Sequence, residues 1–435
     1  MHILLIHQAF AGPGDPGGTR HYEFATELAL RGHRTTIIAS DVSYLTGDRL
    51  EESAAPLPEG VRVVRVASSR RIHASYAARA AGFVGFGAGA LKAALAVRDV
   101  DLVWGTSPPL PQLLPAWIAS LRCRGGLVFE ERDLWPEFAI GMGVLKAGAP
   151  TRAALAFKRF MYARARRVIV NSPGFLPFLD EYGVDRAKVC VVPNGVDPRP
   201  FRPDDRAEDL RREWGADGRF VVVYAGALGP ANALEVVLAA AAKLRDRPVL
   251  FVLVGDGKAR ADLVRAASEQ GLDNVRFVAA VPKDEMPRVL AAADACVATL
   301  RDIPLFCTTY PNKVFDYMAA ARPVLLSIDG VIREVVDGAN AGIFVPPGDS
   351  AGLAAAVERM LADPAAAHDM GLRGRREVLE RFDRRSHAIE IEALFRELVE
   401  SGSEGRGGRS ADPTTLRHER EAARLAARAS ARGGL

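Results

Sequence analysis

Residues 310–327 read YPNKVFDYMAAARPVLLS, a helix-forming segment followed by a short apolar run. Asn312 is a favourable residue for capping a helix amino terminus, which predicts a helix over residues 313–321. The Arg322-Pro323 pair stops that helix, and the run from Val324 to Ser327 predicts a strand. The stretch therefore predicts one helix–strand unit of an α/β domain.

Lys313 and Asp316 lie three residues apart, and so on one face, at the start of this predicted helix. A lysine at a helix amino terminus opposes the helix dipole, but it is favourable where an anion binds to the lysine and to the free backbone N–H groups. Asp316 would suit hydrogen bonds to vicinal hydroxyls, such as those of a ribose. The alternative interpretation is a surface ion pair between Lys313 and Asp316.

Working outward, the same alternation of apolar runs and helical segments fills most of the 435 residues. Fully apolar strands between helices indicate parallel sheets covered on both faces. Because the pattern occurs twice, we predict an α/β protein with two facing, doubly wound, Rossmann-like domains and a cleft between them. The predicted strands are 3–6, 35–39, 61–66, 102–104, 127–130, 167–170, 189–192, 221–225, 249–254, 275–278, 295–298, 324–327 and 342–345.

A proline-rich and charged stretch near residues 195–215 separates the two strand-rich blocks. We expect a first domain over 1–198, a second domain over 199–378, and a helix over 379–401 that returns to the first domain. Residues 402–435 are predicted to be a disordered basic tail, with seven Arg and four Asp or Glu. A basic partner- or membrane-binding helix over 416–432 is the alternative.

Ligands of open α/β sheets bind beyond the carboxyl ends of the strands, so the loops after the strands hold the candidate site. In the first domain, Gly17 and Gly18 would let backbone N–H groups approach a phosphate. Arg132 and Asp133, in ERDLWPE, are candidate catalytic residues; a local Arg–Asp pair that organises the loop is the alternative. In the second domain the candidate ligand-binding residues are Gly226, Gly229, Gly255, Asp256, Thr308, Lys313 and Asp316, and Lys313 is also a candidate catalytic residue.

The formal net charge is +4, and most of it lies in the tail. The nearly neutral body argues against nucleic-acid binding. Cys123, Cys190, Cys296 and Cys307 lack the spacing of a zinc site or of a disulfide framework. With no signal-peptide pattern and no long uncharged apolar run, we expect a cytoplasmic protein, and contact with the inner face of the plasma membrane stays open.

These motifs, in this order, resemble the retaining family-4 glycosyltransferases of GT-B fold, and most closely the bacterial branch of L-fucosamine-type O-antigen and colanic-acid transferases. The resemblance rests on the Gly-Gly loop, TSPP, RDLWPE, VVPNGVD, the YAG…G turn, VGDG and PNKVFDYMAA, within residues 1–395. It implies transfer of a sugar from a nucleotide diphosphate sugar, with UDP the expected nucleotide. It implies that Lys313, with Gly17 and Gly18, meets the diphosphate, that Asp316 holds the ribose, and that Gly255 and Asp256 lie near the base and ribose.

The sequence departs from the family pattern at several positions. Thr308 stands where the first Glu of the E-x7-E element is expected, and Pro230-Ala231 replaces a basic residue. Ala321 replaces a glycine, and Arg132 replaces a histidine, as it does in the close branch. Two alternative functions therefore stay open: a catalytically weakened binding subunit, and another GT-B enzyme such as an epimerase or a phosphorylase.

The resemblance implies front-face chemistry without an essential metal or other cofactor, in which the leaving diphosphate helps to deprotonate the acceptor. The only DxD, Asp99-Val100-Asp101, precedes its strand and so is predicted to be a turn away from the cleft. The acceptor is expected to be polyprenyl-linked or a small molecule. Residues 70–98 could contact a membrane, or simply pack as a helix on their own sheet; they combine Arg70, Arg71, Arg79, Lys92 and Arg98 with Tyr76, Phe83, Val84, Phe86 and Leu91.

Overall fold

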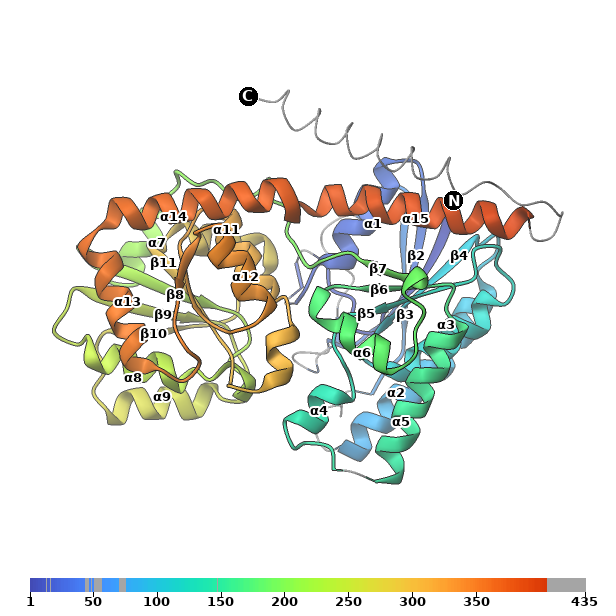
Figure 1. Ribbon diagram of the computed structural model, residues 1–435, viewed down its shortest axis with the longest axis horizontal. Helices are drawn as coiled ribbons and strands as arrows, with labels where there is room; N and C mark the ends of the chain where they lie inside the picture. The colour runs from blue at the N-terminus through green and yellow to red at the C-terminus, as the bar shows by residue number, and fades with distance from the viewer. Residues whose placement is uncertain are drawn as a thin grey trace.

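The computed structural model describes residues 1–404 except 13, 16, 44–46, 48, 51–56, 70–75 and 147. It contains two parallel sheets, one in each half of the chain (Figure 1). The first sheet has the order β3-β2-β1-β4-β5-β6-β7. Its strands are β1 (His2–Ile6), β2 (Arg34–Ser40), β3 (Val61–Val66), β4 (Leu102–Ser107), β5 (Leu127–Glu131), β6 (Arg167–Val170) and β7 (Val189–Val191).

The second sheet has six strands in the order β10-β9-β8-β11-β12-β13. These are β8 (Phe220–Ala225), β9 (Val249–Val254), β10 (Val275–Val278), β11 (Ala295–Thr299), β12 (Val324–Ser327) and β13 (Gly342–Phe344). Every strand predicted from the apolar runs has its counterpart, although β4 continues to Ser107 and β5 to Glu131. The predicted α/β fold with two doubly wound sheets is confirmed.

Helices cover both faces of the first sheet. One face packs against α1 (Arg20–Leu30) and α15 (Arg384–Glu404), and the other against α2 (Tyr76–Ala96), α3 (Leu113–Ser120) and α5 (Ala149–Arg164). The strands are apolar along their whole length because both faces are buried in this way. Two short helices add to the second of these faces: α6 (Leu176–Glu181) contributes the fully buried Leu179 and α4 (Glu137–Gly141) the partly buried Phe138.

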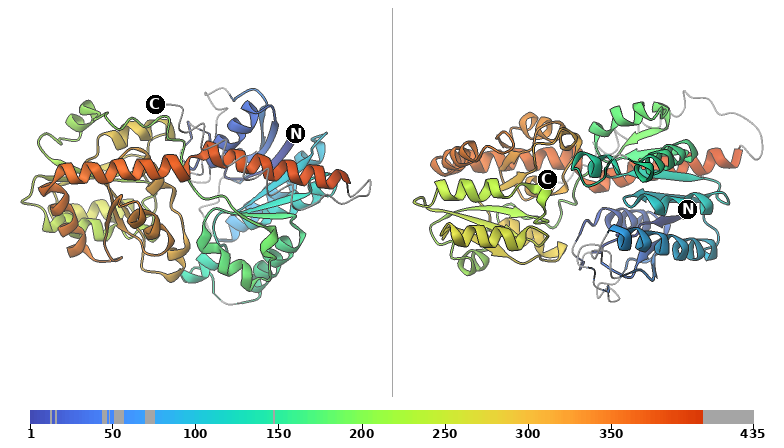
Figure 2. Two further views of the ribbon diagram at one scale, coloured as in Figure 1. Left: turned by 45° about the horizontal axis from the view of Figure 1, so that its top comes forward. Right: turned by 90° about the horizontal axis from the view of Figure 1, so that it is seen from below.

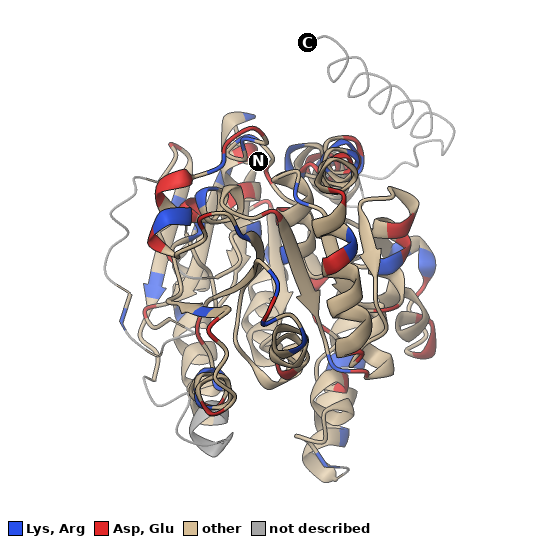
Figure 3. Cartoon of the chain, turned by 90° about the vertical axis from the view of Figure 1, so that its left-hand side faces the viewer, with Lys and Arg blue, Asp and Glu red and all other residues tan. Residues whose placement is uncertain are grey.

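The second sheet is covered in the same way. Its two faces carry α8 (Glu235–Lys243), α9 (Arg260–Glu269) and α13 (Ser350–Ala362) on one side, and α10 (Met286–Ala291), α11 (Asn312–Ala319) and α12 (Val331–Gly338) on the other. The remaining helices are α7 (Glu208–Glu213) and α14 (Pro364–Glu377). Seen from the end in Figure 3, the positions of Lys and Arg are interspersed along the ribbon with those of Asp and Glu.

The start of α11 differs from the prediction. Asn312 is the first residue of the helix rather than its cap, and Pro311 precedes it with an extended backbone. The helix ends at Ala319, and Ala321 follows in the left-handed conformation, with φ of +53°. A glycine would adopt that conformation without steric cost, which explains physically why the family favours glycine there.

The chain crosses between the two halves twice, and the two crossings lie side by side. The Val196 N–H donates to the Phe382 carbonyl at 3.1 Å, and the Arg384 N–H donates to the Val196 carbonyl at 3.0 Å. A Cβ on Gly195 would lie 2.3 Å from the Phe382 oxygen, so only glycine allows this approach. After the second crossing, α15 runs along the first domain (Figures 1 and 2).

Helix α15 is part of the core of the first domain. The fully buried Phe395 packs edge-on against Trp104 with ring centroids 5.3 Å apart. At the helix surface, Glu392 pairs with His33 at 2.9 Å and Glu397 pairs with Arg167 at 2.6 Å. The helix continues to Glu404, slightly beyond the predicted start of the tail, and residues 405–435 lie outside the described residues.

Removing the Phe395 ring tests this docking. Phe395→Ala leaves a cavity between α15 and the sheet, so we expect the free energy of unfolding to fall by about 3–5 kcal/mol in urea denaturation. The control is Arg396→Ala on the exposed face of the same helix, expected to change stability by about 0.5 kcal/mol or less. Equal effects of the two substitutions would contradict the packing of α15 on the first sheet.

Candidate active site

Loops from the carboxyl edges of the two sheets meet. The Ser172 hydroxyl, after β6, donates to the Thr308 carbonyl at 2.5 Å. The Asn194 amide, after β7, donates to the Tyr310 carbonyl at 2.7 Å. Strand order reverses between β1 and β4 in the first sheet and between β8 and β11 in the second, and these switch points are where open α/β sheets bind ligands.

The Lys313 ammonium lies at the switch point of the second sheet. Its Nζ donates to the Tyr224 hydroxyl at 2.6 Å and to the Asn232 amide oxygen at 3.1 Å. It also lies 4.1 Å from the centre of the Tyr224 ring. These partners are neutral, and loss of hydration lowers the pKa of Lys313 to about 7. The half-buried lysine thus has hydrogen-bond acceptors around it but no carboxylate among the described residues to neutralise it.

Three glycines bring the neighbouring loops close beneath this lysine. A Cβ on Gly226 would lie 3.3 Å from the Lys313 amine, and a Cβ on Gly255 would lie 1.9 Å from the Gly226 oxygen. A Cβ on Gly257 would lie 2.6 Å from the Leu228 oxygen. Contact between the β8–α8 and β9–α9 loops therefore accounts for these glycines in the absence of any ligand.

Asp316 lies on α11 but does not pair with Lys313. Its carboxylate accepts from Lys283 Nζ at 2.6 Å, which excludes the predicted alternative of a simple surface pair on one helix face. Lys283 follows β10, so this ion pair joins the β10 loop to α11. Asp256 lies in the exposed β9–α9 loop, where its carboxylate accepts from the Gly257 N–H at 2.7 Å.

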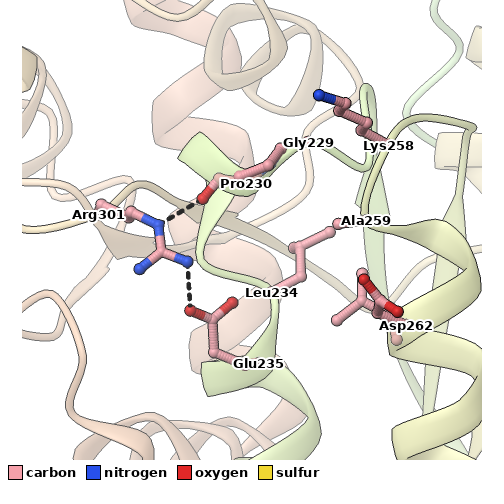
Figure 4. Close-up of a pocket in the computed structure, with 9 residues that line it drawn as sticks. Gly229, Pro230, Leu234, Glu235, Lys258, Ala259, Asp262 and Arg301 are labelled. Carbon is pink, nitrogen blue, oxygen red and sulfur yellow. Dashed lines mark hydrogen bonds and ion pairs between the residues drawn. The ribbon is translucent and has the colours of Figure 1, made fainter. Parts of the chain in front are cut away.

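Thr308 lies at the contact between the domains, and Gly229 lies in the β8–α8 loop. The Thr308 hydroxyl donates to the Leu305 carbonyl at 2.6 Å, and its own carbonyl is held by Ser172, so the residue belongs to the contact between the domains. Gly229 lines a hollow of about 370 Å³ together with Pro230, Lys258 and Arg301 (Figure 4). Arg301 lies at one side of this hollow, where it donates to the Pro230 carbonyl at 2.6 Å and pairs with Glu235 at 3.0 Å.

On the first-domain wall, Arg132 and Asp133 directly follow β5. Arg132 donates to the Thr106 hydroxyl at 2.7 Å and to the Pro108 carbonyl at 3.1 Å, which anchors it to the loop after β4. Asp133 is exposed. Gly17 and Gly18 are exposed in the loop between β1 and α1.

Beneath this wall is a buried charge cluster that the sequence analysis did not identify. Glu130 accepts from Arg20 Nε at 2.9 Å and from His21 Nε2 at 2.5 Å. Burial alone would raise the pKa of Glu130, but His21 and Arg20 hold it well below its usual range. Burial lowers the pKa of His21 to about 4, and neither ring nitrogen of the adjacent buried His7 has a hydrogen-bond partner among the described residues.

The next residue of β5, Glu131, points to the opposite face of the sheet. It accepts from the Tyr162 hydroxyl at 2.5 Å and lies 3.4 Å from the fully buried Lys158 Nζ, which also pairs with Glu137 at 2.9 Å. Two adjacent glutamates therefore anchor the end of β5 from both faces. The sequence offers one sign of this buried charge cluster, because two adjacent glutamates stand at the end of an otherwise apolar strand, LVFEE.

The structure thus brings Lys313 and Gly226 together over Gly255, and it places Arg132 and Asp133 on the facing domain. Asp99-Val100-Asp101 is a turn before β4, as predicted: Asp99 has φ of +55°, and Asp101 accepts from the His2 N–H at 2.8 Å. The described residues contain no group of three His, Cys, Asp or Glu that could hold a metal ion.

Two protein-family models match the chain. Residues 17–195 match the glycosyl transferase 4-like domain, and residues 219–363 match the glycosyl transferases group 1. The first segment contains β2 to β7 of the first sheet, and the second contains the whole of the second sheet.

Curated relatives are similar over much of the chain. The D-inositol 3-phosphate glycosyltransferase of Kineococcus radiotolerans is 29% identical over 86% of this chain and 90% of its own length. The enzyme of the same name from Nocardia farcinica is 31% identical over 59% of this chain, a match that spans 58% of its length. A GDP-mannose-dependent phosphatidylinositol monomannoside mannosyltransferase of Mycolicibacterium smegmatis is 26% identical over 90% of this chain and 98% of its own.

Solved structures share the fold. Sucrose-phosphate synthase from Thermosynechococcus elongatus superposes with a TM-score of 0.74 at 22% identity, covering 92% of this chain and 99% of its own. Anabaena HepE in complex with UDP-glucose gives a TM-score of 0.68 at 21% identity, covering 92% of this chain and 100% of its own.

Proposed function

We propose that this chain, a family-4 glycosyltransferase of GT-B fold, transfers a sugar from a UDP-linked nucleotide diphosphate sugar with retention of anomeric configuration. The proposed acceptor belongs to cell-surface polysaccharide or glycoconjugate synthesis and is polyprenyl-linked or a small molecule. We place the enzyme in the L-fucosamine-transferase-like branch because of the motifs RDLWPE and PNKVFDYMAA.

The observation that carries the proposal is the environment of Lys313. A half-buried ammonium whose hydrogen-bond partners are neutral is costly, because burial removes water that would stabilise the charge, and the same loss of hydration lowers the pKa of Lys313. A diphosphate at the amino end of α11 would supply the missing negative charge and would meet the free N–H groups of the first helical turn. Neutralising the leaving diphosphate lowers the barrier to breaking the sugar–phosphate bond.

The ion pair between Asp316 and Lys283 would lie beside the nucleoside. Asp316 can accept from ribose hydroxyls while it holds Lys283, and Lys283 brings a hydrogen-bond donor from the loop after β10. UDP is our proposal for the nucleotide, and HepE, which has been solved with UDP-glucose, supports it. GDP is the competing nucleotide, because one relative is GDP-mannose-dependent.

The facing wall would receive the acceptor. Arg132 is fixed by Thr106 and Pro108, and Asp133 is open to solvent beside it. In front-face transfer the leaving diphosphate takes the acceptor proton, so these residues would mainly orient the acceptor hydroxyl against the sugar carbon. In this mechanism the protein needs no metal ion, since Lys313 and helix α11 neutralise the diphosphate.

Lys313→Ala tests the diphosphate site. Loss of one charge-assisted hydrogen bond should weaken binding of UDP-glucose or GDP-mannose, whichever binds, by about 10- to 150-fold in calorimetry. The matched control is Lys258→Ala, which removes an exposed lysine from the neighbouring hollow and should leave the affinity unchanged. Unchanged affinity in the Lys313 variant would refute this assignment.

The pKa of Lys313 predicts a pH dependence. In the free protein the lysine loses its proton as pH rises through about 7, and a bound diphosphate would favour the protonated form. Binding should therefore take up a proton, and affinity for the nucleotide sugar should fall by up to about tenfold per pH unit above pH 7. The sugar-esterified diphosphate does not titrate in this range. The dependence should disappear in Lys313→Ala; if it persists there, another group is responsible.

Chelation tests the metal-free mechanism. Sugar transfer by the purified enzyme should survive exhaustive dialysis against EDTA, measured as release of the nucleotide diphosphate. Loss of activity that only Mg²⁺ or Mn²⁺ restores would show that a metal, rather than Lys313, neutralises the diphosphate.

Membrane contact at α2 is a further part of the proposal. Phe86 packs against the first sheet, whereas Val84 is 68% exposed and Lys92 is also exposed on the outer face. Arg70 and Arg71 lie outside the described residues. No helix among the described residues is long and apolar enough to cross a bilayer. We propose that α2 lies against the inner face of the plasma membrane, where a polyprenyl-linked acceptor would be found.

Vesicle co-sedimentation tests this contact. We expect binding to phosphatidylcholine vesicles that contain phosphatidylglycerol, weakened by salt and by Val84→Asp. Val264→Asp, on the exposed face of α9 in the other domain, is the matched control and should bind normally. Binding that survives Val84→Asp but is lost on deletion of residues 405–435 would assign membrane contact to the tail instead.

A further inference from the structure

Arg20, the first residue of α1, is only 3% exposed and donates hydrogen bonds in two directions. Its Nε donates to Glu130 Oε1 at 2.9 Å. Its two terminal nitrogens donate to the Val192 and Pro193 carbonyls, each at 2.8 Å. A planar guanidinium can hold a carboxylate and a turn of backbone at the same time, which a lysine cannot do.

Through its hydrogen bond to Glu130, Arg20 fixes the position of the end of β5. Glu130 is fully buried and is held also by His21 at 2.5 Å. Two residues later the chain reaches Arg132, whose N–H donates to the Ser107 carbonyl at 3.1 Å. Any shift of Glu130 is therefore transmitted over a very short length of backbone to Arg132 and Asp133.

The backbone end leads into the second domain. Val192 and Pro193 directly precede Asn194, whose side-chain oxygen lies 3.5 Å from Arg20 Nη1. The amide nitrogen of Asn194 donates to the Tyr310 carbonyl at 2.7 Å, and Tyr310 lies just before α11 and Lys313. A continuous series of contacts thus runs from Glu130 through Arg20 and Asn194 to Tyr310.

Stability alone is a weak explanation for this series of contacts. Burying a guanidinium and a carboxylate costs hydration free energy that well-packed apolar residues would not cost. The pKa of Arg20 is lowered to about 10 by burial, yet the group stays charged at neutral pH. What the charged pair supplies is fixed geometry, because each of its hydrogen bonds has a required direction.

We propose that Arg20 is a positioning residue that fixes the Arg132–Asp133 loop relative to Lys313 across the domain interface. The inference rests on the proposed function only for the roles of those two loops. The series of contacts from Glu130 to Tyr310 can be tested in the protein without any substrate. A measurement on the unliganded enzyme can therefore fail without refuting the sugar transfer, and the reverse is also true.

Amide hydrogen exchange on Arg20→Lys tests the linkage. This substitution keeps the positive charge but removes the planar guanidinium that donates hydrogen bonds in two directions. We expect exchange to accelerate about tenfold or more at the amides of Arg132 and Trp135 and at those of Thr309 and Val314, with the strands of both sheets unaffected. These four amides donate to backbone carbonyls in the two loops.

The matched control is Arg384→Lys. Arg384 is equally buried and lies where the chain crosses between the domains. It pairs with Glu23 at 2.8 Å and donates to the Gly195 carbonyl. Neither of these contacts involves Glu130 or Asn194, so exchange should rise near α1 and Gly195 but not at Arg132. Acceleration confined to α1 in Arg20→Lys, or the same pattern in both variants, would overturn the proposal.

A second variant covers the case in which Arg20→Lys fails to fold. Asn194→Ala removes the contacts of this side chain with Tyr310 and with Arg20 Nη1 but leaves the hydrogen bond from Arg20 to Glu130, so exchange should accelerate at Thr309 and Val314 but not at Arg132. In enzyme that turns over, both variants should lower kcat while leaving the dissociation constant of UDP or GDP unchanged, since Lys313 and its contacts remain. Unchanged exchange at Thr309 and Val314 in Asn194→Ala would refute the linkage.

Discussion

The direction of the strands constrains everything else in this molecule. All strands of a parallel sheet end on the same edge, so the loops that follow them are brought together even when they are far apart in sequence. Lys313 and Gly226 follow different strands of the second sheet, and Arg132 and Thr106 follow or end different strands of the first. The hydrogen bonds from Ser172 and Asn194 then bring the two edges into contact. The candidate site is a consequence of this arrangement.

The two walls differ in how their charges are satisfied. In the first domain, Glu130 and Glu131 are each neutralised by buried cations from helices on opposite faces of the sheet. In the second domain, the hydrogen-bond partners of Lys313 among the described residues are a hydroxyl and an amide oxygen. Each of the two glutamates thus has an oppositely charged neighbour, whereas Lys313 has no anion beside it in the described part of the chain. This asymmetry is what a donor with a diphosphate and an acceptor with neutral hydroxyls would require.

The fold followed from the sequence because strands buried on both faces are continuously apolar, as in VLFVLV of β9. Lys313 was found because a lysine at a helix start opposes the dipole. The role of Asn312 was predicted wrongly, since Pro311 already sets the extended backbone that precedes the helix. The partners of Asp316 and Glu130 could not be predicted, because Lys283 and Arg20 lie far away in sequence and only the folded sheets bring them close.

A crystal structure with a bound nucleotide sugar would test the central claim most directly. The account predicts the diphosphate at the amino end of α11, with one phosphate oxygen within hydrogen-bond distance of Lys313 Nζ and the Tyr224 hydroxyl released from it. A diphosphate bound instead between Lys258 and Arg301 in the neighbouring hollow, with Lys313 still on Tyr224 and Asn232, would contradict it.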